Sequence, residues 1–213
     1  FFQSRVNYIA EKAVEKNLAG QYYPIFATCL GMQALTAWLA GKKPDLLKSG
    51  INNSNSKGVV QKTSDFAQSS IFDDIDIELT DSAFSGGNLY YSLNFAYLPE
   101  DLLSAPAFKE NCIITATSRS KSGIEFVAMV EHKQFPFFGF QFHPEKTQFE
   151  RLGPNWIKRD PEVVQFVQKL ITTVVDRVRI HELALSEIDS VVRGYFEVYH
   201  TPQRGWEDFE QVY

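Results

Sequence analysis

Three features that mark common classes of protein are scarce or missing in this sequence. Only two of the 213 residues are cysteines, Cys29 and Cys112, which is too few for a disulfide framework. Lys and Arg number 21 against 26 Asp and Glu, so the formal net charge is −5 and the basic surplus typical of nucleic-acid binding is absent. No apolar run approaches the ~18 residues of a membrane-spanning helix. We therefore expect neither nucleic-acid binding nor a membrane span.

Metal-ligand patterns are also missing. The four histidines, at positions 132, 143, 181 and 200, show none of the spacings of metal ligands, so we predict no metal and no cofactor. Hydrophobic residues make up 44% of the chain and aromatic residues 14%, which is enough for a well-packed core. The length fits one large domain, and we take residues 1–213 as a single domain.

The most informative stretch runs from an apolar segment, 22–28, into a helical pattern marked by Leu35, Trp38 and Leu39. The first part is typical of a buried strand and the second of one face of a helix. Cys29 lies at the junction between small neighbours, as a sharp strand-to-helix turn requires. Such a turn would expose the thiol at the positive end of a helix, which favours the thiolate. A small buried structural cysteine is the alternative at this point.

A second stretch, Phe137 to Lys146, alternates aromatic residues and then presents His143, with Pro144 ending the strand. Glu145 follows two residues later and could hold the imidazole in one tautomer. Cys29, His143 and Glu145 together match the nucleophile, base and orienting carboxylate of a catalytic triad. Alone, a histidine at a strand end would more often be structural, but its combination with the Cys29 turn favours catalysis.

These two motifs carry a family resemblance. Phe26-Ala-Thr-Cys-Leu-Gly31 and Gln141-Phe-His-Pro-Glu-Lys146 resemble the nucleophile elbow and the His-Pro-Glu strand of the class I glutamine amidotransferase superfamily. Phe149-Glu150 and the segment Gly194-Tyr-Phe-Glu-Val-Tyr-His-Thr-Pro are similar to the gamma-glutamyl hydrolase branch. The resemblance implies a flavodoxin-like α/β glutaminase fold, a central mixed sheet with helices on both faces.

The resemblance also implies a reaction and its site. The expected activity is cysteine-dependent hydrolysis of gamma-glutamyl bonds through a thioester, with folyl-poly-gamma-glutamates as the substrate class. The Leu30 N–H would donate to the oxyanion. A substrate-side histidine of the family maps near Tyr90 and Tyr91, and Gln33 is closer to glutaminases, so we expect these three residues to bind substrate. The compartment implied is the lysosome, the vacuole or the outside of the cell.

In the family, further βα units precede the elbow strand, whereas only 21 residues precede Tyr22. We therefore expect those N-terminal units to be absent from this chain. Its sheet would then have an edge that a homodimer partner or another chain could cover. This leaves two alternatives to the hydrolase: a weakly active or inactive pseudoenzyme that serves as a structural component of an assembly, and a glutaminase that supplies ammonia to a partner.

The remaining patterns predict secondary structure. Asn52-Asn53-Ser54 is a glycosylation acceptor pattern, or an unmodified part of a polar loop. Cys112 is expected to be a small core residue at the start of a strand. We predict helices over 5–18, from about 98 to 103 and from 161 onward, strands over 71–79, 113–118, 124–131 and 137–143, and a long loop over 42–70.

Overall fold

The computed structural model describes residues 2–147 and 160–179. The helices are α1 (Phe2–Leu18), α2 (Leu30–Leu39), α3 (Ile77–Ser85), α4 (Pro99–Ser104), α5 (Pro106–Asn111) and α6 (Pro161–Arg179). The strands are β1 (Ile25–Thr28), β2 (Leu47–Gly58), β3 (Val60–Lys62), β4 (Leu89–Tyr97), β5 (Cys112–Arg119), β6 (Glu125–His132) and β7 (Phe137–Phe140). Short 3-10 turns occupy Pro44–Leu46, Phe66–Gln68 and Ser70–Phe72.

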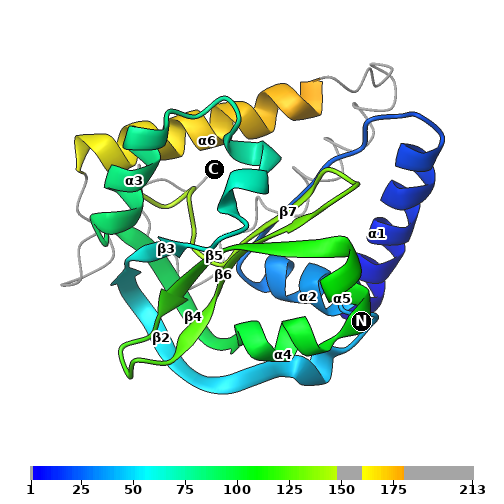
Figure 1. Ribbon diagram of the computed structural model, residues 1–213, viewed down its shortest axis with the longest axis horizontal. Coiled ribbons are helices and arrows are strands. Elements are labelled where there is room, and N and C mark those ends of the chain that lie inside the picture. The colour runs from blue at the N-terminus through cyan, green and yellow to red at the C-terminus, as the bar shows by residue number, and fades with distance from the viewer. Residues whose placement is uncertain (1, 148–159, 180–213) are drawn as a thin grey trace, which may run out of the picture.

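A mixed sheet forms the centre of the molecule. Its strand order is β1-β7-β6-β5-β3, with β1 parallel to β7 and the other neighbours antiparallel. Strands β2 and β4 form a separate antiparallel ribbon. Figure 1 shows α3 and α6 on one side of the sheet and α2, α4 and α5 on the other. The predicted α/β fold, with a mixed sheet and helices on both faces, is therefore confirmed.

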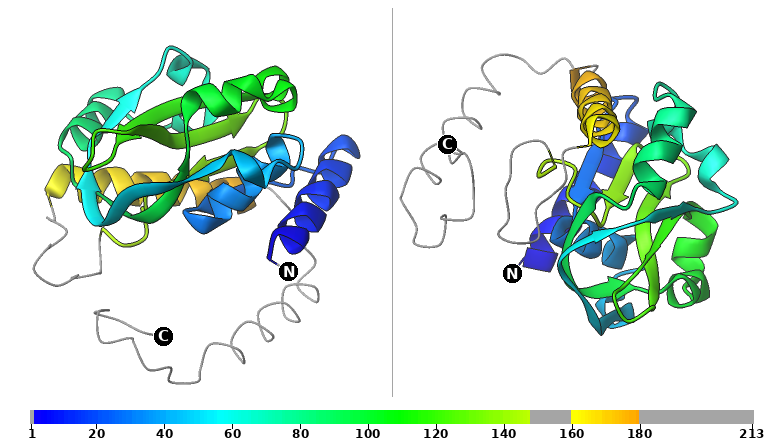
Figure 2. Two further views of the ribbon diagram at one scale, coloured as in Figure 1. Left: turned by 90° about the horizontal axis from the view of Figure 1, so that it is seen from below. Right: turned by 90° about the vertical axis from the view of Figure 1, so that its left-hand side faces the viewer.

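Each face of the sheet has its own hydrophobic core. One cluster joins Phe138 and Phe140 of β7 to Phe166 and Leu170 of α6. The other joins the opposite face to α1, α2 and α5, with fully buried Ala10 and Ala13 on the inner side of α1. Figure 2 shows α1 beside α2 at one end of the molecule. Burial of apolar surface on both faces is what holds the two helical layers to the sheet.

Several predicted elements are confirmed. Helix α1 covers the predicted 5–18, and Gly20 follows it with a φ of 80°, which glycine adopts without strain. The predicted three-strand meander is β5-β6-β7, although β7 ends at Phe140 and not at His143. Cys112 is a free, buried thiol at the start of β5. The predictions for Phe149-Glu150 and the tail segment lie outside the described residues.

The predicted loop over 42–70 is wrong, because most of it forms β2 and β3. The Asn, Ser and Gly residues of this stretch have low strand propensity, which hid the strand. Pairing with the more apolar β4 creates it, and irregular register accommodates Asn52 and Asn55 at positive φ. Asn52, at the possible glycosylation pattern, is exposed. Strand β4 itself was not predicted.

The predicted strand over 71–79 is also wrong. Ile71, Phe72 and Ile75 are buried in and after a 3-10 turn, and α3 follows from Ile77. Asp76 caps this helix by accepting a hydrogen bond of 2.9 Å from the Leu79 N–H. The acidic residues that suggested a solvent-facing side of a strand are therefore partly helix-start signals.

Gly139 lets α2 pack closely on β7, and we expect Gly139→Ala to destabilise the fold. An added Cβ would lie 2.8 Å from Met32 Cγ and 2.8 Å from Val130 Cγ2. Such overpacking costs about 1–3 kcal/mol of unfolding free energy, measurable by urea denaturation. Gly31→Ala is the matched control, because its Cβ would meet only Ala27 Cβ at 3.9 Å. Equal loss of stability in both variants would contradict this account.

Candidate active site

Cys29 occupies a strained turn between β1 and α2. Its backbone has φ 52° and ψ −111°, a conformation that costs a non-glycine residue about 1–3 kcal/mol and that is typical of functional turns. Ala27 keeps a negative φ, so its methyl group is tolerated before the turn. The half-buried thiol lies at the N-terminus of α2 and donates to the Ser92 carbonyl at 3.7 Å. The predicted strand–turn–helix is confirmed.

Parallel pairing brings His143 to the same edge of the sheet. Thr28 pairs with Phe140, and the Cys29 N–H donates to the Phe140 carbonyl at 2.8 Å. His143 follows Phe140 by three residues, and its own N–H donates to the Tyr90 carbonyl of β4 at 2.9 Å. These backbone bonds hold the imidazole between β4 and the end of β7. We call this end of the sheet, where β1 and β7 both terminate, the Cys29 edge.

Hydrogen bonds and charge interactions link His143 to the other two predicted triad residues. Its Nδ1 lies 2.6 Å from Glu145 Oε1. Burial alone would lower the pKa of His143, but side-chain hydrogen bonds to Cys29 and Glu145, and the negative charges of both, raise it from 6.5 to about 9. An imidazolium next to a sulfur atom favours the thiolate that a nucleophile requires. The described structure therefore brings Cys29, His143 and Glu145 together, and their catalytic roles stay predictions.

The other predicted site residues lie in different environments. The Leu30 N–H is the first of α2, where no preceding helical carbonyl can accept from it. Tyr90 faces the site, with its ring centroid 5.8 Å from that of His143. Tyr91 points into the core instead, where it packs edge-on against Phe126, and burial raises its pKa. The structure thus brings Leu30 and Tyr90 to the Cys29 edge but not the side chain of Tyr91.

Gln33 lies behind the site. Its side-chain nitrogen donates to the Phe95 carbonyl at 2.7 Å and to Gln141 Oε1 at 3.3 Å. Its backbone carbonyl accepts from the Tyr97 hydroxyl at 3.0 Å. Gln33 is 7% exposed, so these contacts tie α2 to β4 and to the end of β7. The geometry favours a positioning role over direct contact with substrate.

Sequence reasoning missed two contributions to the Cys29 edge. Asn55 accepts a hydrogen bond of 2.5 Å from the Tyr90 hydroxyl, and the Ser92 carbonyl faces the thiol. Both come from the β2–β4 ribbon, which was not predicted. The signal for β4 was the alternation of apolar and polar residues from Tyr91 to Phe95.

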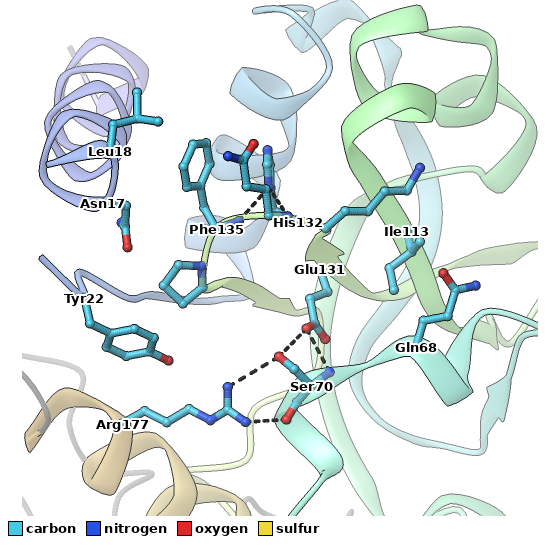
Figure 3. Close-up of a pocket in the computed structure, with 13 residues that line it drawn as sticks. Asn17, Leu18, Tyr22, Gln68, Ser70, Ile113, Glu131, His132, Phe135 and Arg177 are labelled. Atoms are coloured by element: carbon cyan, nitrogen blue, oxygen red, sulfur yellow. Dashed lines mark hydrogen bonds between the residues drawn. The ribbon is translucent and has the colours of Figure 1, made fainter. Parts of the chain in front are cut away.

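Figure 3 shows a second site, a cavity of about 670 Å³. Pro136, just before β7, lines it, so the cavity lies where β7 begins, whereas Cys29 lies where β7 ends. Its polar groups bind one another: Glu131 accepts from Ser69 and Ser70, and Arg177 donates to Ser70. Burial lowers the pKa of His132 to about 4, so the neutral ring accepts from two backbone N–H groups. Because these polar groups already satisfy one another, the strained Cys29 edge is the stronger candidate for the active site.

Two findings bear on the other expectations. Among residues 2–147 and 160–179, no group of three or more His, Cys, Asp or Glu side chains could hold a metal ion. Within the same ranges no helix is long and apolar enough to cross a bilayer. A strained cysteine before a helix, next to a histidine–carboxylate pair, matches the general arrangement of an activated nucleophile.

The comparisons with known proteins name the family. Residues 3–160 match the model of "Glutamine amidotransferase class-I", so the chain belongs to the class I glutamine amidotransferase family. It is 28% identical over 82% of its length to gamma-glutamyl hydrolase 2 of Arabidopsis thaliana, covering 50% of that protein. It is 29% identical over 88% of its length to gamma-glutamyl hydrolase of Rattus norvegicus, covering 59%. The resemblance to the gamma-glutamyl hydrolase branch is confirmed.

The chain spans about half the length of the curated relatives it matches, 49% for the probable gamma-glutamyl hydrolase 3 of Arabidopsis thaliana. A crystal structure from Thermoplasma acidophilum, of a protein provisionally assigned to a GMP synthase, aligns with a TM-score of 0.38 and 16% identity. That alignment covers 75% of this chain and 63% of the other.

The coupling at His143 predicts its titration. We expect its imidazole to titrate near pH 9 by NMR, and Glu145→Gln to move the pKa toward 6.5, because the amide keeps an acceptor but loses the charge. Glu125→Gln removes a carboxylate that pairs with Arg119 and should leave the titration unchanged. A His143 pKa that Glu145→Gln does not lower would contradict the coupling.

The same shift has a consequence for stability. The pKa of His143 is higher in the folded than in the unfolded chain, so its contribution to unfolding free energy is complete below pH 6.5. That contribution is lost as pH rises through about 9. We expect wild type to lose stability over this window, relative to His143→Gln, in urea unfolding.

Proposed function

We propose that this chain hydrolyses gamma-glutamyl amide bonds, with Cys29 as the nucleophile. The observation that carries the proposal is the strained Cys29 turn coupled to the His143–Glu145 pair, whose two side chains lie 2.6 Å apart. The similarity to gamma-glutamyl hydrolases supports the bond class. Poly-gamma-glutamates, including folyl-poly-gamma-glutamates, are the substrate class we propose. The lysosomal, vacuolar or secreted location implied by the resemblance stays a prediction.

Acylation would proceed as follows. The Cys29 sulfur attacks the gamma-carbonyl carbon and forms a C–S bond, and the negative charge moves to the carbonyl oxygen. The Leu30 N–H donates to that oxygen, and one such donor is worth about 2.7–4 kcal/mol of barrier. His143 gives its proton to the amide nitrogen, the C–N bond breaks, and the amine leaves. A thioester with Cys29 remains.

Deacylation reverses the proton transfers. Neutral His143 takes a proton from water, and the resulting hydroxide attacks the thioester carbon. The C–S bond breaks, which releases a gamma-carboxylic acid that gives its proton to water, and the sulfur returns as a thiolate next to the imidazolium. Glu145 keeps the imidazole oriented through both steps by its bond to Nδ1. No group beyond these side chains and water is needed to balance the reaction.

Neighbouring polar groups suit a glutamyl substrate. The Tyr90 hydroxyl is already oriented by Asn55, and the Tyr90 ring lies next to His143. Phenol and amide groups can hydrogen-bond amides and carboxylates without carrying charge. We propose that Tyr90 contacts substrate. Gln33 positions β4 and does not contact substrate.

We expect Cys29→Ala to abolish turnover of a gamma-glutamyl peptide, and His143→Gln to reduce it by about 10²–10⁴-fold, as loss of a general acid and base does. Chromatography of the released glutamate measures the turnover of both variants. Cys112→Ala removes the other thiol, which is buried in the core. This variant should hydrolyse the peptide at the wild-type rate.

Three results would overturn the proposal. Equal turnover in wild type and Cys29→Ala would exclude the nucleophile. A strong preference for free glutamine over the gamma-glutamyl peptide would identify a glutaminase. No turnover of either compound by wild type would favour a structural role in an assembly, for which β1, at one end of the described sheet, offers an edge to a partner strand.

A further inference from the structure

A hollow of about 300 Å³ lies where the β2–β3 junction meets the turn between β5 and β6. Three basic residues line it, Lys57 from β2, Arg119 from the end of β5, and Lys121 from the turn. We call this hollow the basic pocket. Its lining residues come from β2, the β2–β3 junction and the β5–β6 turn, and Figure 1 shows β2, β3 and β4 on the opposite side of the molecule from α1. It is distinct from both the Cys29 edge and the cavity where β7 begins.

The charge of the basic pocket is one-sided. No Asp or Glu lines it, although the chain has 26 acidic against 21 basic residues. Arg119 is partly compensated by Glu125 at 2.9 Å, but no described carboxylate pairs with Lys57 or Lys121. Lys121 donates to the Ser54 carbonyl at 3.1 Å, which holds the turn against β2. A local positive field in an acidic protein favours an anionic ligand at this place.

An unsatisfied donor also lines the basic pocket. Asn53 is 1% exposed, and its side-chain nitrogen has no hydrogen-bond partner among the described residues. A buried N–H without an acceptor costs about 1–3 kcal/mol, so a native structure seldom keeps one without a reason. That nitrogen is enclosed in this structure, so it would meet a bound anion only if the Asn53 side chain turned toward the basic pocket.

The basic pocket is connected to the Cys29 edge through the β2–β4 ribbon. Lys57 lies opposite Tyr90, and opposite residues in an antiparallel pair project from the same face. The Tyr90 ring contacts that of His143, and Lys146 Nζ lies 5.9 Å from the centre of the Tyr90 ring. Positive groups therefore extend from His143 past Tyr90 to Lys57 and into the basic pocket.

We propose that the basic pocket binds the free carboxylates of a gamma-linked glutamate chain while an amide bond of that chain lies at Cys29. The inference rests on the proposed function. A gamma-linked chain carries one free alpha-carboxylate per residue, so a longer chain reaches more of the positive groups. Lys57 is the first contact beyond Tyr90, and Lys121 and Arg119 bind carboxylates further from the cleaved bond. The basic pocket thereby gives preference for long substrates.

The first test compares chain lengths. Wild type should cleave a gamma-linked glutamate pentamer with a higher kcat/KM than the dimer. In the double variant Lys57→Gln/Lys121→Gln, the loss of kcat/KM should grow with length to about fivefold for the pentamer, and should appear in KM. Lys12→Gln, which removes one positive charge from α1, should change kcat/KM for the dimer and the pentamer by the same factor. Sodium chloride should shrink the length preference of wild type, because salt screens such exposed charges.

A second test does not depend on turnover. Binding of the pentamer to Cys29→Ala, measured by calorimetry, should weaken about fivefold in Cys29→Ala/Lys57→Gln/Lys121→Gln but not in Cys29→Ala/Lys12→Gln. If wild type cleaves no gamma-glutamyl bond and the pentamer still binds in this charge-dependent way, the proposed function fails and the pocket assignment stands. Cleavage without length preference, or equal binding of an alpha-linked glutamate pentamer, would overturn the pocket assignment.

Discussion

The parallel pairing of β1 with β7 is the constraint on which the rest of the site depends. It aligns Thr28 with Phe140, so both strands end at the same edge and Cys29 lies next to the segment that carries His143. The Cys29 N–H extends this ladder by one hydrogen bond beyond the strand, which helps to hold the strained turn. Gly139 leaves room for α2 above β7, so the helix that follows the turn packs directly on the same strand.

The β2–β4 ribbon completes what this pairing begins. Its backbone carbonyls at Tyr90 and Ser92 accept from the His143 N–H and the Cys29 thiol, and Gln33 ties the ribbon to α2. Contacts of this kind restrict the imidazole and the sulfur without placing another charged side chain beside them. The ribbon also places the positive charge of Lys57 between the Cys29 edge and the basic pocket. One element therefore orients the proposed catalytic groups and lines the proposed binding surface.

The sequence by itself determined the elements whose signals are local. Helices α1 and α6 and the β5-β6-β7 meander follow from apolar periodicity and turn residues, which depend on neighbouring positions in the chain. The Cys29 turn was recognisable because small residues must flank a tight strand-to-helix junction. His143 and Glu145 were recognisable because only two positions separate them, and their short contact depends on that spacing.

Tertiary structure alone decided the features that arise from pairing between distant segments. Strand β2 exists because β4 pairs with it, against the low strand propensity of its Asn and Ser residues. The pleat of β4 turns Tyr90 toward His143 and Tyr91 into the core, a choice that adjacent identical residues cannot reveal. The basic pocket joins Lys57 to Arg119 and Lys121, more than 60 positions apart, through strand packing. Register between strands is a non-local quantity, and local patterns do not contain it.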